Sequence, residues 1–215
     1  MVNKRHKGYR QLRQEDGVTL LELMISTLIL GIVITVAMPS FSDIGDSQRL
    51  IGATEQLYNH IQQARSESVS GNTAAFVNFN APVSPTAASA TWQYGISVAN
   101  SLCALTATTP TTANACVIVI DDGDGTVDPG DGTVDTGDLV LMRFTDADWT
   151  DVSMQINGFS SGNTQIVFNP VRGTATSGTI NLVSGNGKLL RINVGLLGRA
   201  IICSPDGSVI NYKVC

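Results

Sequence analysis

The chain has 215 residues, of which 43% are hydrophobic and 14% are charged, and it contains 21 glycines. This composition fits one strand-rich domain with an anchor, and it excludes a disordered chain or a coiled coil. The formal net charge is −5, but residues 1–17 hold five of the 13 Lys and Arg residues and two of the 18 acids. Beyond residue 17, 8 basic residues therefore stand against 16 acidic ones, a net charge of −8. Such an acidic body argues against general nucleic-acid binding, which requires excess cations to meet phosphates.

Residues 18–38 form an apolar run in which Glu22 is the only charged residue. As a helix rising about 1.5 Å per residue, the run is long enough for the roughly 30 Å hydrocarbon core of a bilayer. The basic stretch before it predicts a cytoplasmic N-terminus and an exported body. A carboxylate in such a run costs about 2.5–3.5 kcal/mol on insertion scales, so Glu22 is expected to have a partner. A plain signal anchor does not explain this residue, and an ordinary secretory signal lacks a good cleavage site after the run.

The helical pattern is expected to continue beyond the apolar run to about Ser70. Pro39 is expected to kink the helix rather than end it. An inner face is predicted from positions at three- and four-residue spacing, namely Leu50, Thr54, Leu57, Ile61, Ala64 and Ser68. Gly71-Asn72 then supplies a C-terminal stop. Residues 39–70 are therefore predicted to be an amphipathic continuation of one long helix.

After residue 71 the pattern changes to short β-strands. Alternating apolar residues bounded by turn residues predict strands at 74–79, 92–98, 116–120, 139–144, 165–168, 178–183, 189–194 and 200–203. Gly185-Asn186-Gly187 predicts a hairpin turn. The expected fold class is α+β, in which the long N-terminal helix packs on an antiparallel β-sheet domain, with two small sheets expected.

The four cysteines are Cys103, Cys116, Cys203 and Cys215, and all follow the apolar run. The sequence contains no CxxC pattern and only two histidines, so a zinc site is not expected. Two disulfides in an oxidising compartment fit better. Four cysteines allow three pairings; proximity in the sequence favours Cys103–Cys116 and Cys203–Cys215, and the alternatives stay open.

The segment Gly17-Val18-Thr19-Leu20-Leu21-Glu22 resembles the prepilin signature of type IV pilins and type II secretion pseudopilins. The resemblance implies that a prepilin peptidase cleaves after Gly17 and that Val18, which stands where the family usually has Phe, becomes the N-methylated terminus. It also implies that Glu22 acts in filament assembly. The expected organisation is a leader at 1–17, a transmembrane and filament-core helix at 18–38, its amphipathic continuation at 39–70, and a β-rich globular pilin domain at 71–215.

Later motifs resemble FimT/GspH-like minor pilins and pseudopilins. They are Gln62-Gln63-Ala64-Arg65-Ser66-Glu67-Ser68, the run from Ile118 to Arg143, Phe168-Asn169-Pro170-Val171-Arg172-Gly173, Gly178-Thr179-Ile180 and Leu197-Gly198-Arg199. The resemblance implies a structural, non-enzymatic minor pilin of a type IV pilus, serving initiation, adhesion, twitching or DNA uptake. A minor pseudopilin of a type II secretion system is the close alternative. The implied partners are other pilins, the prepilin peptidase, the inner membrane and the assembly platform.

Two further features admit a binding role that we do not favour. Carboxylates at Asp122, Asp124 and Asp128 lie in a glycine-rich repeat that could supply oxygens to Ca²⁺, but the EF-hand register fails because Ile120 occupies the first ligand position. A solvated loop lengthened by duplication is the favoured interpretation, and no cofactor is expected. Arg199 is a DNA candidate by resemblance, although Ile201 replaces the second Arg of the Gly-Arg-x-Arg motif found in DNA-binding relatives, so an edge-strand arginine is favoured.

Overall fold

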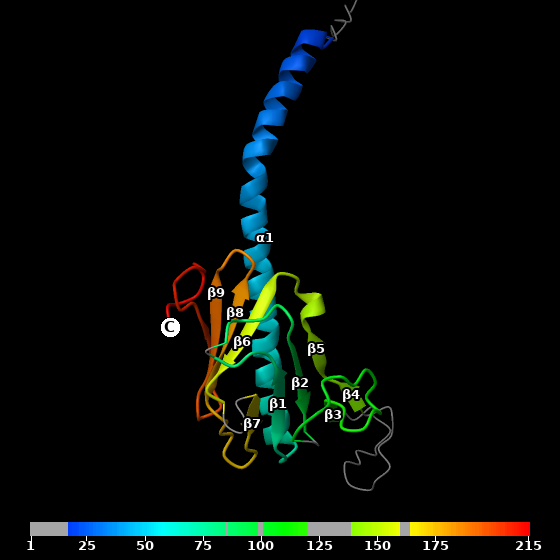
Figure 1. Cartoon of the computed structure of the whole chain (residues 1–215), viewed down its shortest axis with the longest axis vertical. Helices are drawn as coiled ribbons and strands as arrows, with labels where there is room; N and C mark the ends of the chain where they lie inside the picture. Colours follow the sequence, from blue (N-terminus) through cyan, green and yellow to red (C-terminus); the bar gives the residue numbers. More distant parts are fainter. Residues whose placement is uncertain (1–16, 85, 99–100, 120–138, 160–163) are drawn as a thin grey trace, which may run out of the picture. The chain divides into compact units, whose positions relative to one another are not determined.

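The computed structural model describes residues 17–84, 86–98, 101–119, 139–159 and 164–215 (Figure 1). The chain divides into two compact units, Met1–Ser42 and Asp43–Cys215. Helix α1 (Leu20–Ser70) contributes to both units, and it is helical through Pro39, which confirms that the proline does not end the helix. Among the described residues, no helix has the length and apolar character needed to cross a membrane.

The second half of α1 buries the face that its sequence pattern predicts. All six predicted positions, Leu50, Thr54, Leu57, Ile61, Ala64 and Ser68, are 0% exposed. The buried hydroxyls keep hydrogen bonds, since Thr54 Oγ1 donates to the Leu50 carbonyl at 2.7 Å and Ser68 Oγ donates to the Thr73 carbonyl at 2.8 Å. The helix ends where Asn72, at a φ of 50°, adopts the left-handed conformation that asparagine tolerates.

Within the described residues, three antiparallel sheets follow the helix, one more than expected, and the α+β fold class is confirmed. The first sheet has the order β5-β2-β1-β7 and consists of β1 (Ala75–Asn80), β2 (Gln93–Ser97), β5 (Arg143–Thr145) and β7 (Gln165–Phe168). The second has the order β10-β9-β8-β6 and consists of β6 (Val152–Asn157), β8 (Gly178–Ser184), β9 (Leu189–Val194) and β10 (Ala200–Cys203). The third pairs β3 (Val117–Val119) with β4 (Leu139–Leu141).

Two strand predictions require correction. The single strand expected at 139–144 is two strands, because the chain changes partner at Met142. The Met142 N–H donates to the Cys116 carbonyl at 2.8 Å, and the Met142 carbonyl accepts from Ile96 N–H at 2.9 Å. β4 therefore pairs with β3, whereas β5 pairs with β2. Strand β6 was not predicted at all, although its side chains alternate between buried and half-buried over most of its length.

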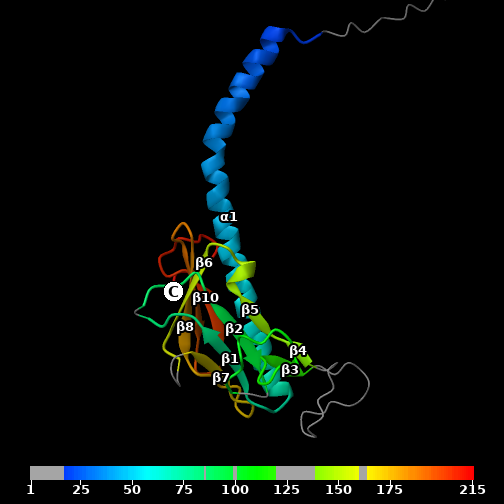
Figure 2. The same ribbon diagram turned by 45° about the vertical axis from the view of Figure 1, so that its right-hand side comes forward.

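One hydrophobic core joins the second half of α1 to both four-stranded sheets (Figure 2). Its largest fully buried side chains include Trp92, Tyr94, Phe159, Phe168, Leu57 and Ile61. Trp92 precedes β2, and its Nε1–H donates to the Val152 carbonyl at the start of β6, 2.9 Å away. This bond ties the two sheets together and satisfies the polar end of a buried ring. The predicted turn at Gly185–Gly187 joins β8 to β9, and the Gly187 N–H donates to the Ser184 carbonyl.

His60 of α1 lies half-buried in a cluster of aromatic rings. Its Nδ1 is 2.9 Å from the Tyr94 hydroxyl, and its ring stacks on Phe144 with centroids 4.0 Å apart. Burial lowers the pKa of His60, because the imidazolium form loses hydration in this position. The pKa of Tyr94 is raised above its usual value, first by burial and then by the charge of Asp148. His60 therefore belongs to the core as a neutral ring.

This environment predicts an acid-sensitive contribution to stability from His60. Its folded-state pKa lies below the unfolded value of about 6.5. Between these two pKa values the unfolded state therefore binds more protons than the folded state. The free energy of unfolding should therefore fall as the pH decreases through about 6.5. Urea unfolding at pH 7.5 and 5.5 measures the difference, and a His60→Gln variant should show a smaller one. An equal pH dependence in both proteins would contradict the assignment.

Candidate processing and assembly site

A threonine caps the start of α1. Residues Gly17–Thr19 precede the helix, and the Glu22 N–H donates to Thr19 Oγ1 at 3.2 Å. The Leu23 N–H donates to the Thr19 carbonyl at 3.2 Å, which is the first intrahelical bond. Threonine is a favoured N-cap, and Thr-x-x-Glu is the spacing of a capping box. Sequence reasoning did not single out Thr19, although this spacing was the available signal.

The peptide bond between Gly17 and Val18 is exposed and lies outside the helix. A Cβ placed on Gly17 would meet no atom within 4 Å, and the Val18 side chain is 68% exposed. Exposed backbone outside regular structure is the preferred substrate of proteases, because it enters an active site without unwinding. The capped helix begins at Leu20, three residues after Gly17. A cut at the Gly17–Val18 bond therefore does not pass through the helix.

The carboxylate of Glu22 lies in the first turn of α1, where the helix dipole favours a negative charge. Among the described residues it has no hydrogen-bond or ion-pair partner. A cut after Gly17 would create an α-ammonium group on Val18, four residues earlier in the chain. The two groups then carry opposite charges at one end of one helix.

Apolar side chains cover the rest of this part of α1. Those that are 44–76% exposed are Leu20, Leu21, Leu23, Met24, Ile25, Leu28, Ile29, Leu30, Ile32, Val33 and Ile34, and Val18 just before the helix is 68% exposed. A helix that is apolar all round is stable only when lipid or other protein surrounds it. An apolar environment would suit this surface, and the Glu22 carboxylate is the exception among its side chains.

The structure pairs the four cysteines as sequence proximity favours. Cys103 bonds Cys116 with Cα atoms 4.9 Å apart, and Cys203 bonds Cys215 with Cα atoms 5.1 Å apart. The first disulfide closes a loop that packs against β2 at Gly95. A Cβ at Gly95 would lie 2.5 Å from Cys116 Sγ, so this position requires glycine. The side chain of Asn78 on β1 also donates to Cys103 Sγ at 3.3 Å.

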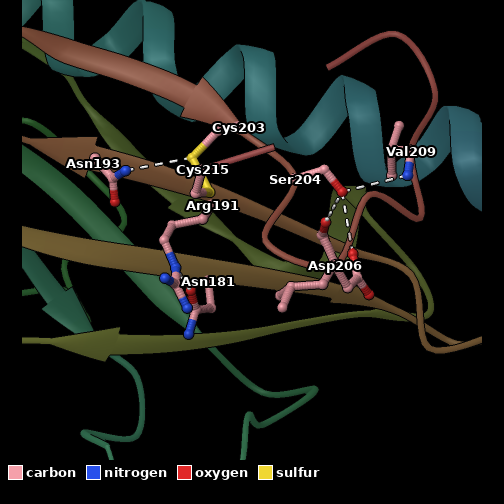
Figure 3. Close-up of a disulfide and its surroundings, with 9 residues drawn as sticks. Asn181, Arg191, Asn193, Cys203, Ser204, Asp206, Val209 and Cys215 are labelled. Atoms are coloured by element: carbon pink, nitrogen blue, oxygen red, sulfur yellow. Dashed lines mark hydrogen bonds between the residues drawn. A yellow bond between two sulfur atoms is a disulfide. The ribbon is translucent and has the colours of Figure 1, made fainter. Parts of the chain in front are cut away.

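The second disulfide fastens the C-terminal segment to β10 (Figure 3). The Ser204 N–H donates to the Lys213 carbonyl at 2.8 Å, and Ser204 Oγ donates to Asp206 Oδ1 at 3.1 Å. Hydrogen bonds from the Ser208 hydroxyl and N–H lower the pKa of Asp206, because they favour its charged form. The neighbouring Asn193 of β9 donates to Cys203 Sγ at 3.3 Å. These bonds fix the turn that follows β10.

Three motifs that are far apart in the sequence meet beside α1. Arg65 Nη2 donates to the Leu197 carbonyl at 3.3 Å. Gly173 and Gly198 have φ angles of 59° and 72°, which favour glycine. A Cβ on Gly198 would lie 2.2 Å from the Gly173 carbonyl oxygen and 3.1 Å from Arg65 Nε. The two turns therefore pack backbone against backbone, and the arginine of the helix secures them.

The structure bears differently on the calcium candidates and on the DNA candidate of the sequence analysis. Asp122, Asp124 and Asp128 lie outside the described residues, and within those residues no three His, Cys, Asp or Glu side chains are placed to hold a metal ion. Arg199 is exposed on the turn that leads into β10, and in the described part of the chain it forms no ion pair. Ile201 stands two residues after Arg199, where DNA-binding relatives have the second Arg, so this strand supplies no second cation beside Arg199.

Two family models match parts of this chain. The family model described as type II transport protein GspH matches residues 53–198. The chain belongs to the GspH family. The model of the prokaryotic N-terminal methylation motif matches residues 12–38, which include Gly17, Val18 and Glu22. The chain thus combines an N-methylation motif with a body of the minor pilin and pseudopilin type, and proteins of this type assemble with other pilins in filaments.

Individual known proteins add little to the family assignment. No curated protein matches this chain. Among solved structures, the type IV minor pilin FimU of Pseudomonas aeruginosa (strain PAO1) is 16% identical, with a TM-score of 0.38, over 70% of this chain and 90% of that one. The family is shown by the GspH model, which matches residues 53–198.

The contact between the two turns predicts different effects for two left-handed glycines. Gly187 has a φ of 84° and nothing within 4 Å of an added Cβ. Gly187→Ala should therefore cost only the left-handed penalty of about 1–2 kcal/mol. Gly198→Ala should cost about 1–3 kcal/mol more, because its Cβ meets the Gly173 carbonyl. Urea unfolding of both variants gives the comparison, and equal losses would show that the turns are not in contact.

Proposed function

We propose that this chain is a structural subunit of a type IV pilus, a minor pilin made as a precursor and assembled through its N-terminal helix. The observation that carries the proposal is the start of α1, where an exposed Gly17–Val18 bond precedes a capped helix that carries Glu22 in its first turn. The methylation-motif match over residues 12–38 supports it. A prepilin peptidase cuts after Gly17 and Val18 is N-methylated, and the role of the chain is structural rather than catalytic.

In this proposal the precursor enters the inner membrane through residues 18–38 and presents its C-terminal domain to the periplasm. The support is the sequence, where one carboxylate stands in 21 otherwise uncharged residues after a basic leader. The same apolar surface then packs among the helices of neighbouring subunits when an assembly platform moves the subunit into the filament. Lipid and filament core are interchangeable surroundings for such a surface, because both are apolar.

Glu22 sets the axial position of the subunit in the filament. Its carboxylate pairs with the terminal ammonium of a neighbouring Val18, and in an apolar core an unpaired charge costs several kcal/mol. A subunit that slips along the helix axis leaves both groups without partners. The apolar surface therefore supplies the affinity, while the pair of charges selects one register.

A second candidate is a minor pseudopilin of a type II secretion system, and the description of the matching family, a type II transport protein, favours it. Both candidates share the processing site and the assembly helix, so they differ in the machine that the subunit joins. Deletion of the gene discriminates between them. Loss of surface pili and twitching supports the pilus, whereas retention of exoproteins in the periplasm supports the secretion system.

The processing step predicts a defined mature terminus. Mass spectrometry of the mature protein should find methylated Val18, and Gly17→Arg should leave the full-length precursor in the membrane fraction because the peptidase requires a small residue at this position. Gly8→Arg alters another leader glycine and should leave cleavage unchanged. A mature terminus elsewhere in the chain, or normal cutting of the Gly17→Arg protein, would refute the proposed site.

The charge-pair proposal predicts that Glu22→Ala inserts and is cleaved but enters filaments poorly. Glu22→Gln should fail in the same way, because it keeps the shape of the side chain and removes its charge. Comparison of membrane and sheared-filament fractions with wild type measures incorporation, and mass spectrometry checks cleavage.

Thr19→Ala is the matched control for this experiment. It removes the N-cap at a cost of about 1 kcal/mol of helix stability, yet it leaves the Glu22 carboxylate in place. It should therefore enter filaments far better than Glu22→Gln. Equal incorporation of Glu22→Gln and wild type would show that helix packing alone sets the register.

A further inference from the structure

The charges of this acidic chain are segregated along its sequence. Residues 152–205 contain no Asp or Glu and four basic residues, namely Arg172, Lys188, Arg191 and Arg199. This stretch therefore carries four positive charges, although the chain beyond residue 17 has a net charge of −8. Two of these cations, Arg172 and Arg199, are exposed on turns that lie at the end of the domain where α1 ends (Figure 1).

The same two turns, at 169–173 and 195–198, expose aliphatic side chains. Val171 is 82% exposed on the first turn, and Leu196 and Leu197 are 67% and 76% exposed on the second. A shallow hollow of about 570 Å³ lies beside the second turn. Because the backbones of the turns touch, these side chains and the neighbouring cations form one surface. This surface, the two-turn patch, consists of Val171, Arg172, Leu196, Leu197 and Arg199.

The last turns of α1 extend the apolar and cationic character of the two-turn patch. Val69, which is 54% exposed, lies beside Gly173, and Arg65 bonds the Leu197 carbonyl. Glu67 lies two residues from both Arg65 and Val69, which is about 200° around the helix axis, so it projects toward a different side. Among the described residues, neither arginine of the patch forms an ion pair. The patch therefore presents cations and aliphatic groups without a neutralising carboxylate.

The C-terminal segment also exposes apolar side chains, but in a different electrostatic setting. Ile210 is 95% exposed, and the hollow beside it is lined by both Asp43 and Lys188. Asp206 and Lys213 lie on the same disulfide-closed segment. Charges of both signs therefore accompany this surface, and it offers no net attraction to an anion. The comparison distinguishes the two-turn patch and supplies a control position for its test.

We propose that the two-turn patch binds the surface of an anionic phospholipid membrane. Its aliphatic side chains enter the boundary between head groups and acyl chains, and Arg172 and Arg199 bind lipid phosphates. Binding to such a surface is stabilised by apolar burial together with attraction between cations and anionic head groups. Guanidinium groups suit this role because they bind phosphate oxygens in a bidentate manner. The proposal goes beyond the role in a filament and does not depend on it.

The chemistry of the patch disfavours two other occupants. The phosphates of duplex DNA would meet the arginines, but DNA offers no apolar surroundings to the exposed aliphatic side chains, and its affinity requires several cations. A second copy of this chain could offer its acidic stretch at 121–138, whose aliphatic side chains are only those of Val127 and Val134. That stretch would satisfy the charge and leave most of the apolar surface exposed. An anionic membrane satisfies both.

The test uses the full chain, with its apolar helix wrapped in a non-ionic amphipathic polymer, and a tryptophan reporter at one of two exposed positions. Leu197→Trp reports on the two-turn patch, and Ile210→Trp reports on the C-terminal segment. Vesicles that contain phosphatidylglycerol and brominated acyl chains should quench the Leu197→Trp emission at least about twice as strongly as the Ile210→Trp emission. Vesicles of brominated phosphatidylcholine alone should quench neither. Each reporter reads only its own position, so binding through the basic leader does not imitate insertion of the patch.

Charge reversal gives a second readout. Arg172→Glu in the Leu197→Trp chain should raise the lipid concentration for half-maximal quenching at least about tenfold, whereas Lys213→Glu, the same change of charge on the C-terminal segment, should alter it by no more than about twofold. Equal quenching of the two reporters, quenching that does not require phosphatidylglycerol, or equal effects of the two charge reversals would overturn the proposal. So would a response of the Leu197→Trp emission to duplex DNA but not to vesicles, or self-association of the chain through the patch. None of these outcomes bears on Glu22, which lies in the other unit of the chain.

Discussion

Burial of one face of the second half of α1 is the constraint on which the rest of the domain depends. Fully buried Leu and Ile side chains each contribute about 1.5–3 kcal/mol, and this face carries Leu50, Leu57 and Ile61. The same stretch of helix places His60 against the aromatic rings of the first sheet and Arg65 under a turn of the second. Both sheets are therefore positioned by a single helix, and its earlier residues, at 20–35, expose apolar side chains all round.

The contacts at Arg65 give a physical reason for motifs that are scattered along the sequence. A guanidinium on the helix reaches a carbonyl on one turn, and that turn approaches another so closely that a Cβ on Gly198 would meet the Gly173 carbonyl oxygen. Each motif alone is short and common. Together they specify one tertiary contact, and this contact holds the turn from which Arg199 and β10 begin.

Sequence patterns predicted what is local and missed what depends on distant partners. The buried helix positions and the turn at Gly185–Gly187 follow from spacing alone, and most strands were found within two residues of their ends. The change of strand partner at Met142 has no local signal, because it depends on Cys116 and Ile96. At the N-terminus, the resemblance drew attention to Gly17, Val18 and Glu22. The cap at Thr19 was overlooked, although its spacing to Glu22 was readable from the sequence.

Coverage of a sheet edge is a feature that sequence cannot reveal, since it depends on where other segments pass. Proteins commonly blunt such edges with lysine, proline, a bulge or a covering loop. Residues Ala200–Cys203 of the edge strand β10 contain neither lysine nor proline, yet Ala200 is only 2% exposed. The disulfide from Cys203 to Cys215 ties the C-terminal segment beside Ser204, whose N–H donates to the Lys213 carbonyl. At this edge, tertiary packing and a covalent link therefore provide the protection that local sequence signals provide elsewhere.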